Sequence, residues 1–172
     1  MLILVSGGSG SGKSEFAEGL IVASPAAPRI YIATMRLWDL ESEQRVARHR
    51  EMRADKGFAT LECPVDLMGA EVTADSAVLV EDLSNLVANE YYGGEPFGVG
   101  GRILGGVQRL RDRAALTVVV TNELFSDGIV YNCETEDYLA CLADLNRALS
   151  AMADEVYEVV CGIPVCHKGA QP

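Results

Sequence analysis

Eight residues near the start of the chain, Gly7-Gly8-Ser9-Gly10-Ser11-Gly12-Lys13-Ser14, dictate most of what can be said about its architecture. They match the pattern G-x-x-x-x-G-K-[ST] at every fixed position. The apolar run Leu2–Val5 precedes them and an amphipathic stretch follows, as expected of a strand, a loop and a helix. Such a loop turns several backbone N–H groups toward one phosphate at the N-terminus of the helix.

The two residues that end this loop carry the chemistry of a triphosphate site. Lys13 can reach the β- and γ-phosphates of a nucleotide, and the Ser14 hydroxyl can ligate Mg²⁺. The sequence therefore predicts that ATP or GTP binds here together with Mg²⁺. The motif leaves open whether the nucleotide is hydrolysed, transferred or only sensed.

Short apolar, β-branched runs alternate with longer amphipathic stretches along the chain. The expected strands are Leu2–Ser6, Arg29–Thr34, Ala77–Glu81, Leu116–Thr121 and Glu155–Val160. The expected helices cover about Lys13–Ala23, Leu40–Ala54, Leu83–Tyr91, Gly100–Ala114 and Glu136–Ala153. Because the strands are continuously apolar rather than alternating, both of their faces should be buried. The pattern predicts an α/β fold, a mostly parallel sheet with helices on both faces.

Three stretches look irregular. Tyr92–Gly101 holds five glycines and a proline, which predicts a flexible connection. Glu123–Thr135 follows a strand end, at the edge of an open α/β sheet where ligands usually bind. Gly162–Pro172 should form a last short strand and a loose tail. No repeat or linker divides the chain, so we expect one domain over residues 1–172.

Composition bounds the location and the partners. The formal charge of −11, from 25 acidic and 14 basic residues, disfavours binding to nucleic acid or anionic lipid. The five cysteines form no CxxC pair, which fits reduced thiols in a cytosol. Met1–Val5 is too short for a signal-peptide core, and no run approaches the roughly 18 apolar residues of a membrane span. We expect a soluble cytoplasmic protein. Cys161, Cys166 and His167 lack a fourth ligand at a familiar zinc spacing, which disfavours a metal site.

A second acidic site is predicted at the end of the expected strand Ala77–Glu81. Two carboxylates, Glu81 and Asp82, end this apolar run. An acidic residue at such a position can hold Mg²⁺ or orient an attacking group. Glu81 is the first choice and Asp82 the reserve, and the alternative is an ordinary exposed strand end.

One expected helix carries an unusual positive charge for an acidic protein. Glu41, Arg45, His49 and Arg53 recur every four residues and share a helical face. Arginines beside a histidine disfavour its protonation, and a neutral imidazole can attack a phosphorus atom. From helix geometry alone, a solvated charged face with an ordinary Glu41–Arg45 pair remains the favoured interpretation. The other histidine, His167, is expected to be structural or exposed.

Further patterns run along nearly the whole chain. They are Leu2–Ser14, Tyr31–Thr34, Asp39, Glu41, R-V-x-x-H-x-x-x-R at Arg45–Arg53, Thr60–Glu62 with Pro64, the strand ending at Glu81, Val120–Glu123, Gly128–Val130, Asn146, Ala153–Val156 and Gly162-Ile163. With these residues the chain resembles the bifunctional adenosylcobinamide kinase / adenosylcobinamide-phosphate guanylyltransferase family of cobalamin synthesis. The histidine helix followed by T-x-E-x-P is the most specific part.

The resemblance implies a RecA-like P-loop domain, assembly as a homotrimer and two reactions. A nucleoside triphosphate would phosphorylate adenosylcobinamide; GMP from GTP would then pass through a histidine, here His49, to the phosphorylated corrinoid. Lys13 with Mg²⁺ would neutralise the leaving pyrophosphate, and Glu81 would assist the metal. The positions implied to contact nucleotide, besides the glycine-rich loop, are Arg50, Glu51, Met52, Arg53, Glu62, Ala33, Thr34 and Met35.

The chain departs from the family pattern in several places. The segment Gly8–Ser11 lacks the usual arginine, Tyr131 replaces a proline, Leu139-Ala140 replaces an Arg-Asp pair, and Arg147 replaces a glutamine. These changes concern substrate handling and the kinase step more than nucleotide binding. Two other interpretations stay open: a small-molecule kinase or NTPase that uses the loop without His49, and a nucleotide-sensing protein without catalysis. The sequence does not decide between ATP and GTP for the kinase step.

Overall fold

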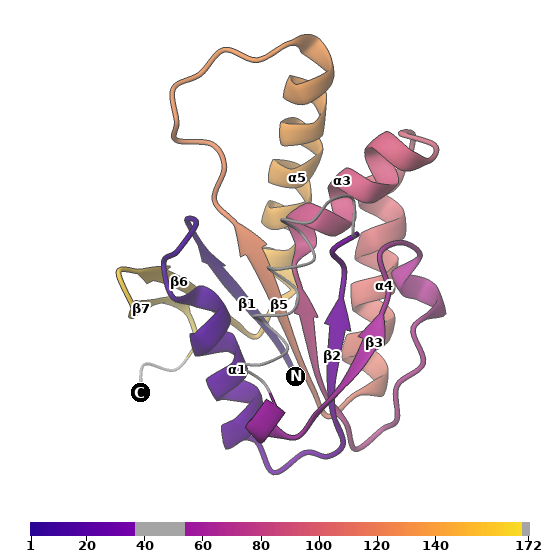
Figure 1. Cartoon of the computed structure of the whole chain (residues 1–172), viewed down its shortest axis with the longest axis vertical. Helices are drawn as coiled ribbons and strands as arrows, with labels where there is room; N and C mark the ends of the chain where they lie inside the picture. Colours follow the sequence, from indigo (N-terminus) through magenta and orange to yellow (C-terminus); the bar gives the residue numbers. More distant parts are fainter. Residues whose placement is uncertain (37–53, 170–172) are drawn as a thin grey trace.

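A computed structural model describes residues 1–36 and 54–169 of the chain. These residues form a seven-stranded sheet in the order β3-β2-β4-β5-β1-β6-β7 (Figure 1). All neighbouring strands pair in parallel except β7, which runs antiparallel to β6. The strands are β1 Leu2–Gly7, β2 Arg29–Ala33, β3 Phe58–Glu62, β4 Ala77–Glu81, β5 Leu116–Asn122, β6 Glu155–Val160 and β7 Ile163–Lys168.

Helices cover both faces of this sheet, as the sequence predicts. They are α1 Lys13–Ala23, α3 Leu83–Gly93, α4 Val99–Arg113 and α5 Cys133–Met152, with short 3₁₀ turns at Ala54–Lys56 (η1) and Leu67–Gly69 (η2). Alternate residues of β1 enter opposite cores: Leu2 packs on the side of α3, α4 and α5, and Ile3 packs on the side of α1. Burial of both strand faces explains why the strands read as continuous apolar runs.

The five strands expected from the sequence are present, and Gly162–Pro172 supplies β7. The prediction missed β3, because this edge strand is largely exposed and its sequence lacks an apolar run. The connection expected at Tyr92–Gly101 is present but shorter: α3 continues to Gly93, and α4 begins at Val99, close to the helix start expected at Gly100. Most of the helix expected at Leu40–Ala54, residues 40–53, lies outside the described residues.

The connection from β5 to α5 is the largest departure from a minimal α/β fold. Residues 123–132 and the first turns of α5 extend beyond the carboxyl edge of the sheet (Figure 1). The helix begins at Cys133, earlier than predicted, because the Asn132 side chain caps it by accepting from the backbone N–H of Thr135 at 2.9 Å. Within the described ranges 1–36 and 54–169, no helix has the length and apolar character needed to cross a membrane.

Candidate nucleotide and magnesium site

The glycine-rich loop joins β1 to α1 with the geometry that its sequence predicts. Gly10 and Gly12 have φ values of 69° and 91°, a left-handed conformation that favours glycine. The Lys13 ammonium donates to the carbonyl oxygen of Gly8 at 3.1 Å, so it lies across the loop. A Cβ at Gly7 would stand 2.7 Å from the carbonyl oxygen of Val159, so this residue must also be small. The loop is thus shaped to present backbone N–H groups to phosphate at the start of α1.

The Ser14 hydroxyl, in the first turn of α1, donates a short hydrogen bond to Oε1 of Glu81, at the end of β4. The other carboxylate oxygen of Glu81, Oε2, is buried and has no hydrogen-bond partner among the described residues. Burial raises the pKa of Glu81 from 4.5 to about 7; the bond from Ser14 opposes this rise and the charge of Asp82 adds to it. A buried carboxylate oxygen beside a hydroxyl is a set of hard oxygen donors that fits Mg²⁺.

Asp82 has a structural role that separates it from Glu81. Its carboxylate caps α3 by accepting from the backbone N–H of Asn85 at 2.8 Å. It also accepts from the Ser84 hydroxyl at 2.6 Å and from the Asn122 amide at 3.1 Å. Because these bonds occupy both of its oxygens, the geometry favours Glu81 over Asp82 as the metal-facing carboxylate.

The end of β2 lies beside this carboxylate pair. Thr34 is fully buried, and its hydroxyl donates to the carbonyl oxygen of Asp82 at 2.8 Å. Its backbone N–H donates to the carbonyl oxygen of Glu81 at 3.1 Å. The Thr34 side chain therefore holds β2 to β4, and the nucleotide contacts expected of Ala33, Thr34 and Met35 stay predictions.

Glu62 and Glu81 lie on the same edge of the sheet. Ala33 in β2 pairs with Glu62 on one side and with Glu81 on the other. Neighbouring strands are about 4.8 Å apart, so the Cα atoms of Glu62 and Glu81 are separated by about 10 Å. Glu62 is exposed at the end of β3. The remaining predicted residues, His49, Arg50, Glu51, Met52 and Arg53, lie outside the described residues.

Sequence reasoning missed a buried amide that positions these strand ends. Asn89 in α3 donates from its side chain to the carbonyl oxygens of Thr34 at 2.7 Å and Pro64 at 2.9 Å. It thereby fixes the chain just after β2 and β3. The only sequence signal is a polar residue on an apolar helix, which by itself indicates no partner.

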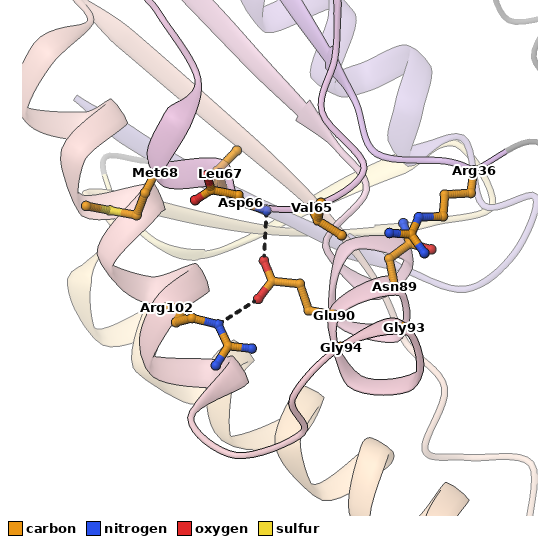
Figure 2. Close-up of a pocket in the computed structure, with 10 residues that line it drawn as sticks. All are labelled: Arg36, Val65, Asp66, Leu67, Met68, Asn89, Glu90, Gly93, Gly94 and Arg102. Carbon is orange, nitrogen blue, oxygen red and sulfur yellow. Dashed lines mark hydrogen bonds and ion pairs between the residues drawn. The ribbon is translucent and has the colours of Figure 1, made fainter.

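Glu90, the next residue, organises a cavity of about 360 Å³ beside Asn89 (Figure 2). Its carboxylate accepts from the backbone N–H of Asp66 at 3.2 Å and pairs with the Arg102 guanidinium at 3.1 Å. Arg102 also donates to the carbonyl oxygens of Phe97 and Glu95, so it fixes the connection between α3 and α4. Glu90 and Arg102 thus link α3, the segment at Asp66 and the start of α4 to one another.

The C-terminal residues considered for a metal site lie in the β6–β7 hairpin. His167 contacts Glu158 at 3.0 Å between Nε2 and Oε2, and about half of its side chain is exposed. Cys166 donates to the carbonyl oxygen of Lys168. Within residues 1–36 and 54–169, no three His, Cys, Asp or Glu side chains are grouped for a metal ion.

The sequence is similar to one family of known proteins over nearly its whole length. A family model described as "Cobinamide kinase / cobinamide phosphate guanyltransferase" matches residues 3–166. The bifunctional adenosylcobalamin biosynthesis protein CobU of Salmonella typhimurium is 33% identical over 96% of this chain and 98% of its own length. The Escherichia coli protein of the same name is 32% identical over the same shares.

Solved structures show the same fold at low sequence identity. The flagellar accessory protein FlaH from Methanocaldococcus jannaschii has a TM-score of 0.55 at 12% identity, covering 98% of this chain and 78% of its own. The RadB recombinase has a TM-score of 0.51 at 15% identity, covering 91% and 73%. The sheet, the loop and these likenesses together make the fold a RecA-like P-loop fold.

Proposed function

Because the chain belongs to the cobinamide kinase / cobinamide phosphate guanyltransferase family of transferases, we propose that it carries out both reactions on adenosylcobinamide. The observation that carries this proposal is the extent of the family match. Residues 3–166 include the phosphate loop, the Glu81 strand end and His49. A likeness confined to the loop would support nucleotide binding alone.

In the first reaction, ATP or GTP phosphorylates the aminopropanol hydroxyl of adenosylcobinamide. The hydroxyl oxygen bonds to the γ-phosphorus, the bond from that phosphorus to the β–γ bridging oxygen breaks, and the hydroxyl proton leaves to solvent. Lys13 and the N–H groups of residues 8–14 stabilise the negative charge of the phosphates. Ser14 and Glu81 would hold Mg²⁺, which would neutralise part of the triphosphate charge.

In the second reaction, a ring nitrogen of His49 bonds to the α-phosphorus of GTP. The bond from that phosphorus to the α–β bridging oxygen breaks, and pyrophosphate leaves. A phosphate oxygen of the phosphorylated corrinoid then displaces the histidine, giving adenosylcobinamide-GDP. Two displacements replace one difficult step: a neutral imidazole attacks the highly charged triphosphate, and the corrinoid phosphate then meets only the less charged guanylyl group. Arg50 and Arg53 would neutralise the α-phosphate. The other nucleotide contacts would come from Glu51, Met52, Glu62, Ala33, Thr34 and Met35.

A covalent label separates this mechanism from a plain kinase. The protein is incubated with GTP radiolabelled at the α-phosphate, denatured and analysed for retained label. Wild type should retain an acid-labile, alkali-stable label that His49→Ala loses, while His49→Ala still phosphorylates adenosylcobinamide. Lys13→Ala should slow both reactions about 100-fold, because each uses the triphosphate.

The chain offers a matched control, because its sequence contains two histidines. His167→Ala should keep the label, since His167 lies in the β6–β7 hairpin and pairs with Glu158. A wild-type protein that binds GTP and stays unlabelled would remove the histidine mechanism. Equal loss of both reactions in His49→Ala would give that residue a structural role instead.

The proposal extends to assembly and location. We infer a cytosolic homotrimer that binds no nucleic acid. The trimer rests on the family resemblance, and the cytosol on the free thiols of all five cysteines and on the corrinoid substrate. Light scattering on the purified chain tests the first of these inferences.

A further inference from the structure

The structure contains a recess that the nucleotide chemistry does not use. It lies between residues 123–132 and the first three turns of α5, where Figure 1 shows that segment standing beyond the sheet edge. Two neighbouring cavities of about 420 and 290 Å³ share four lining residues, and together they are here called the α5 recess. The shared residues are Leu124, Asp127, Tyr131 and Leu139.

Hydrogen bonds within the connection give the α5 recess its shape. Oε1 of Glu123 accepts from the Phe125 N–H and the Ser126 hydroxyl, both at 2.9 Å. The Tyr131 hydroxyl donates to the Asp127 carboxylate at 2.5 Å. These bonds hold residues 123–131 in local turns beside the start of α5.

The α5 recess adjoins the phosphate site on two sides. The backbone N–H of Glu123, which lines it, donates at 3.0 Å to the carbonyl oxygen of Gly7, the first residue of the phosphate loop. The Tyr138 hydroxyl, also in the lining, donates at 3.3 Å to the carbonyl oxygen of Ser84, just after the two strand-end carboxylates. Because β5 lies between β1 and β4, its carboxyl end lies between Gly7, the last residue of β1, and Glu81, the last residue of β4.

The lining has the wrong charge for a triphosphate. Glu123, Asp127 and Glu136 contribute carboxylates, and no described residue of the lining carries a positive charge. The other side chains are mainly apolar or aromatic, and Tyr138 continues into a cluster with Tyr91 and Tyr92 at ring-centroid distances of 6.4 and 5.7 Å. Such a hollow repels a polyphosphate and suits a neutral or cationic amphipathic molecule.

We propose that the α5 recess is the acceptor site, which holds the alcohol-bearing part of an amphipathic, amide-rich and uncharged or cationic substrate beside the γ-phosphate. This inference rests on the proposed function, in which that substrate is adenosylcobinamide. Amide N–H groups would donate to the three carboxylates, and apolar ring edges would contact Leu124 and Leu139. Tyr131, Leu139 and Ala140, at which the chain departs from the family pattern, all line the recess and would set its selectivity.

Two arginine substitutions from opposite walls test the proposal. Leu139→Arg fills the recess from α5 and Leu124→Arg fills it from the connection; each adds one positive charge. Asp144→Ala is the matched control, because it lies on the same helix outside the lining, is exposed and raises the net charge equally. Equilibrium dialysis against adenosylcobinamide, read by corrinoid absorbance, gives the dissociation constant without requiring turnover.

Both arginine variants should weaken adenosylcobinamide binding at least about tenfold, while Asp144→Ala stays within about twofold of wild type. All three should retain label from α-labelled GTP, which also shows that each variant is folded. Leu124 is partly exposed in a connection, so its variant does not depend on repacking a core.

Unchanged corrinoid binding in both arginine variants would overturn the inference while leaving the proposed function intact. If light scattering on those variants then also shows a changed molar mass, the recess is a contact between copies of the chain. Failure of wild type to bind adenosylcobinamide would instead remove the proposed acceptor itself.

Discussion

Glu81→Gln should abolish a pH dependence of stability that the wild-type protein shows without metal. Burial raises the pKa of Glu81 from 4.5 to about 7 in the folded chain. Between these values the folded protein holds a proton that the unfolded chain has released, so the folded state binds more protons. The free energy of unfolding must therefore fall as pH rises through this window. Glutamine has no proton to lose there.

The magnitude follows from the size of the shift. Each pKa unit corresponds to about 1.4 kcal/mol, so the difference in unfolding free energy between wild type and variant should change by about 3 kcal/mol from pH 4.5 to 7.5. At high pH the free energy of unfolding of Glu81→Gln should exceed that of wild type by about 2 kcal/mol. The remaining amount, about 1 kcal/mol, is lost because the glutamine N–H₂ replaces Oε2, which has no hydrogen-bond partner among the described residues. The change with pH is the cleaner quantity, since that cost is constant.

Urea unfolding followed by circular dichroism, at half-unit steps from pH 4.5 to 8 with a chelator present, measures this difference. Other titrating groups such as Asp127 and Asp154 occur in both proteins and cancel. Added Mg²⁺ should stabilise wild type at pH 8 and leave Glu81→Gln unchanged. A difference that stays flat within about 0.5 kcal/mol across the window would refute the burial argument, and with it the reason for assigning Mg²⁺ to this carboxylate.

Two further substitutions test the packing behind the site. Asn89→Ala removes both side-chain bonds to Thr34 and Pro64, so it should cost about 2 kcal/mol of unfolding free energy and raise the GTP KM; an unchanged KM would deny it a positioning role. Gly106→Ala should lower the free energy of unfolding, measured in urea, by about 1–3 kcal/mol, because the new Cβ would stand 2.8 Å from Leu67 Cβ. Gly101→Ala on the same helix is the control: its Cβ meets nothing within 4 Å, so it should not destabilise the protein. Equal effects at the two glycines would mean that helix propensity, and not the contact with Leu67, governs α4.

The sequence predicted those parts of the fold that depend on local patterns. The phosphate loop and β1 follow from glycine spacing and an apolar run, both of which act over fewer than ten residues. The edge strand β3 was missed because Ala59, Thr60 and Glu62 face solvent and give no burial signal. At Tyr92–Gly101 the glycines predicted too long a connection, because α3 continues to Gly93 and α4 begins at Val99 despite the low helix propensity of glycine.

The candidate site likewise contains residues that a local motif predicts and residues whose roles depend on distant contacts. Lys13 and Ser14 are predicted directly by a motif, whereas the roles of Asn89 and Asp82 required knowing which distant groups they meet. Asp82 and Asn122 are 40 residues apart and contact only because β4 and β5 are adjacent. The predicted nucleotide role of Thr34 came from the resemblance, and only the structure shows its hydroxyl directed at the backbone of Asp82.

Strand order also explains how one phosphate loop can serve two reactions. In the proposed mechanism the acceptor alcohol approaches the γ-phosphorus, whereas the histidine approaches the α-phosphorus, nearer the nucleoside. In this sheet the α5 recess opens from β5, on one side of the Glu81 strand, while Ala33 and Glu62 end β2 and β3 on the other side. A substrate in the recess and a guanosine near Glu62 would therefore occupy separate ends of the same edge. Changes at Tyr131 and Leu139 can then alter acceptor selectivity while nucleotide binding is preserved.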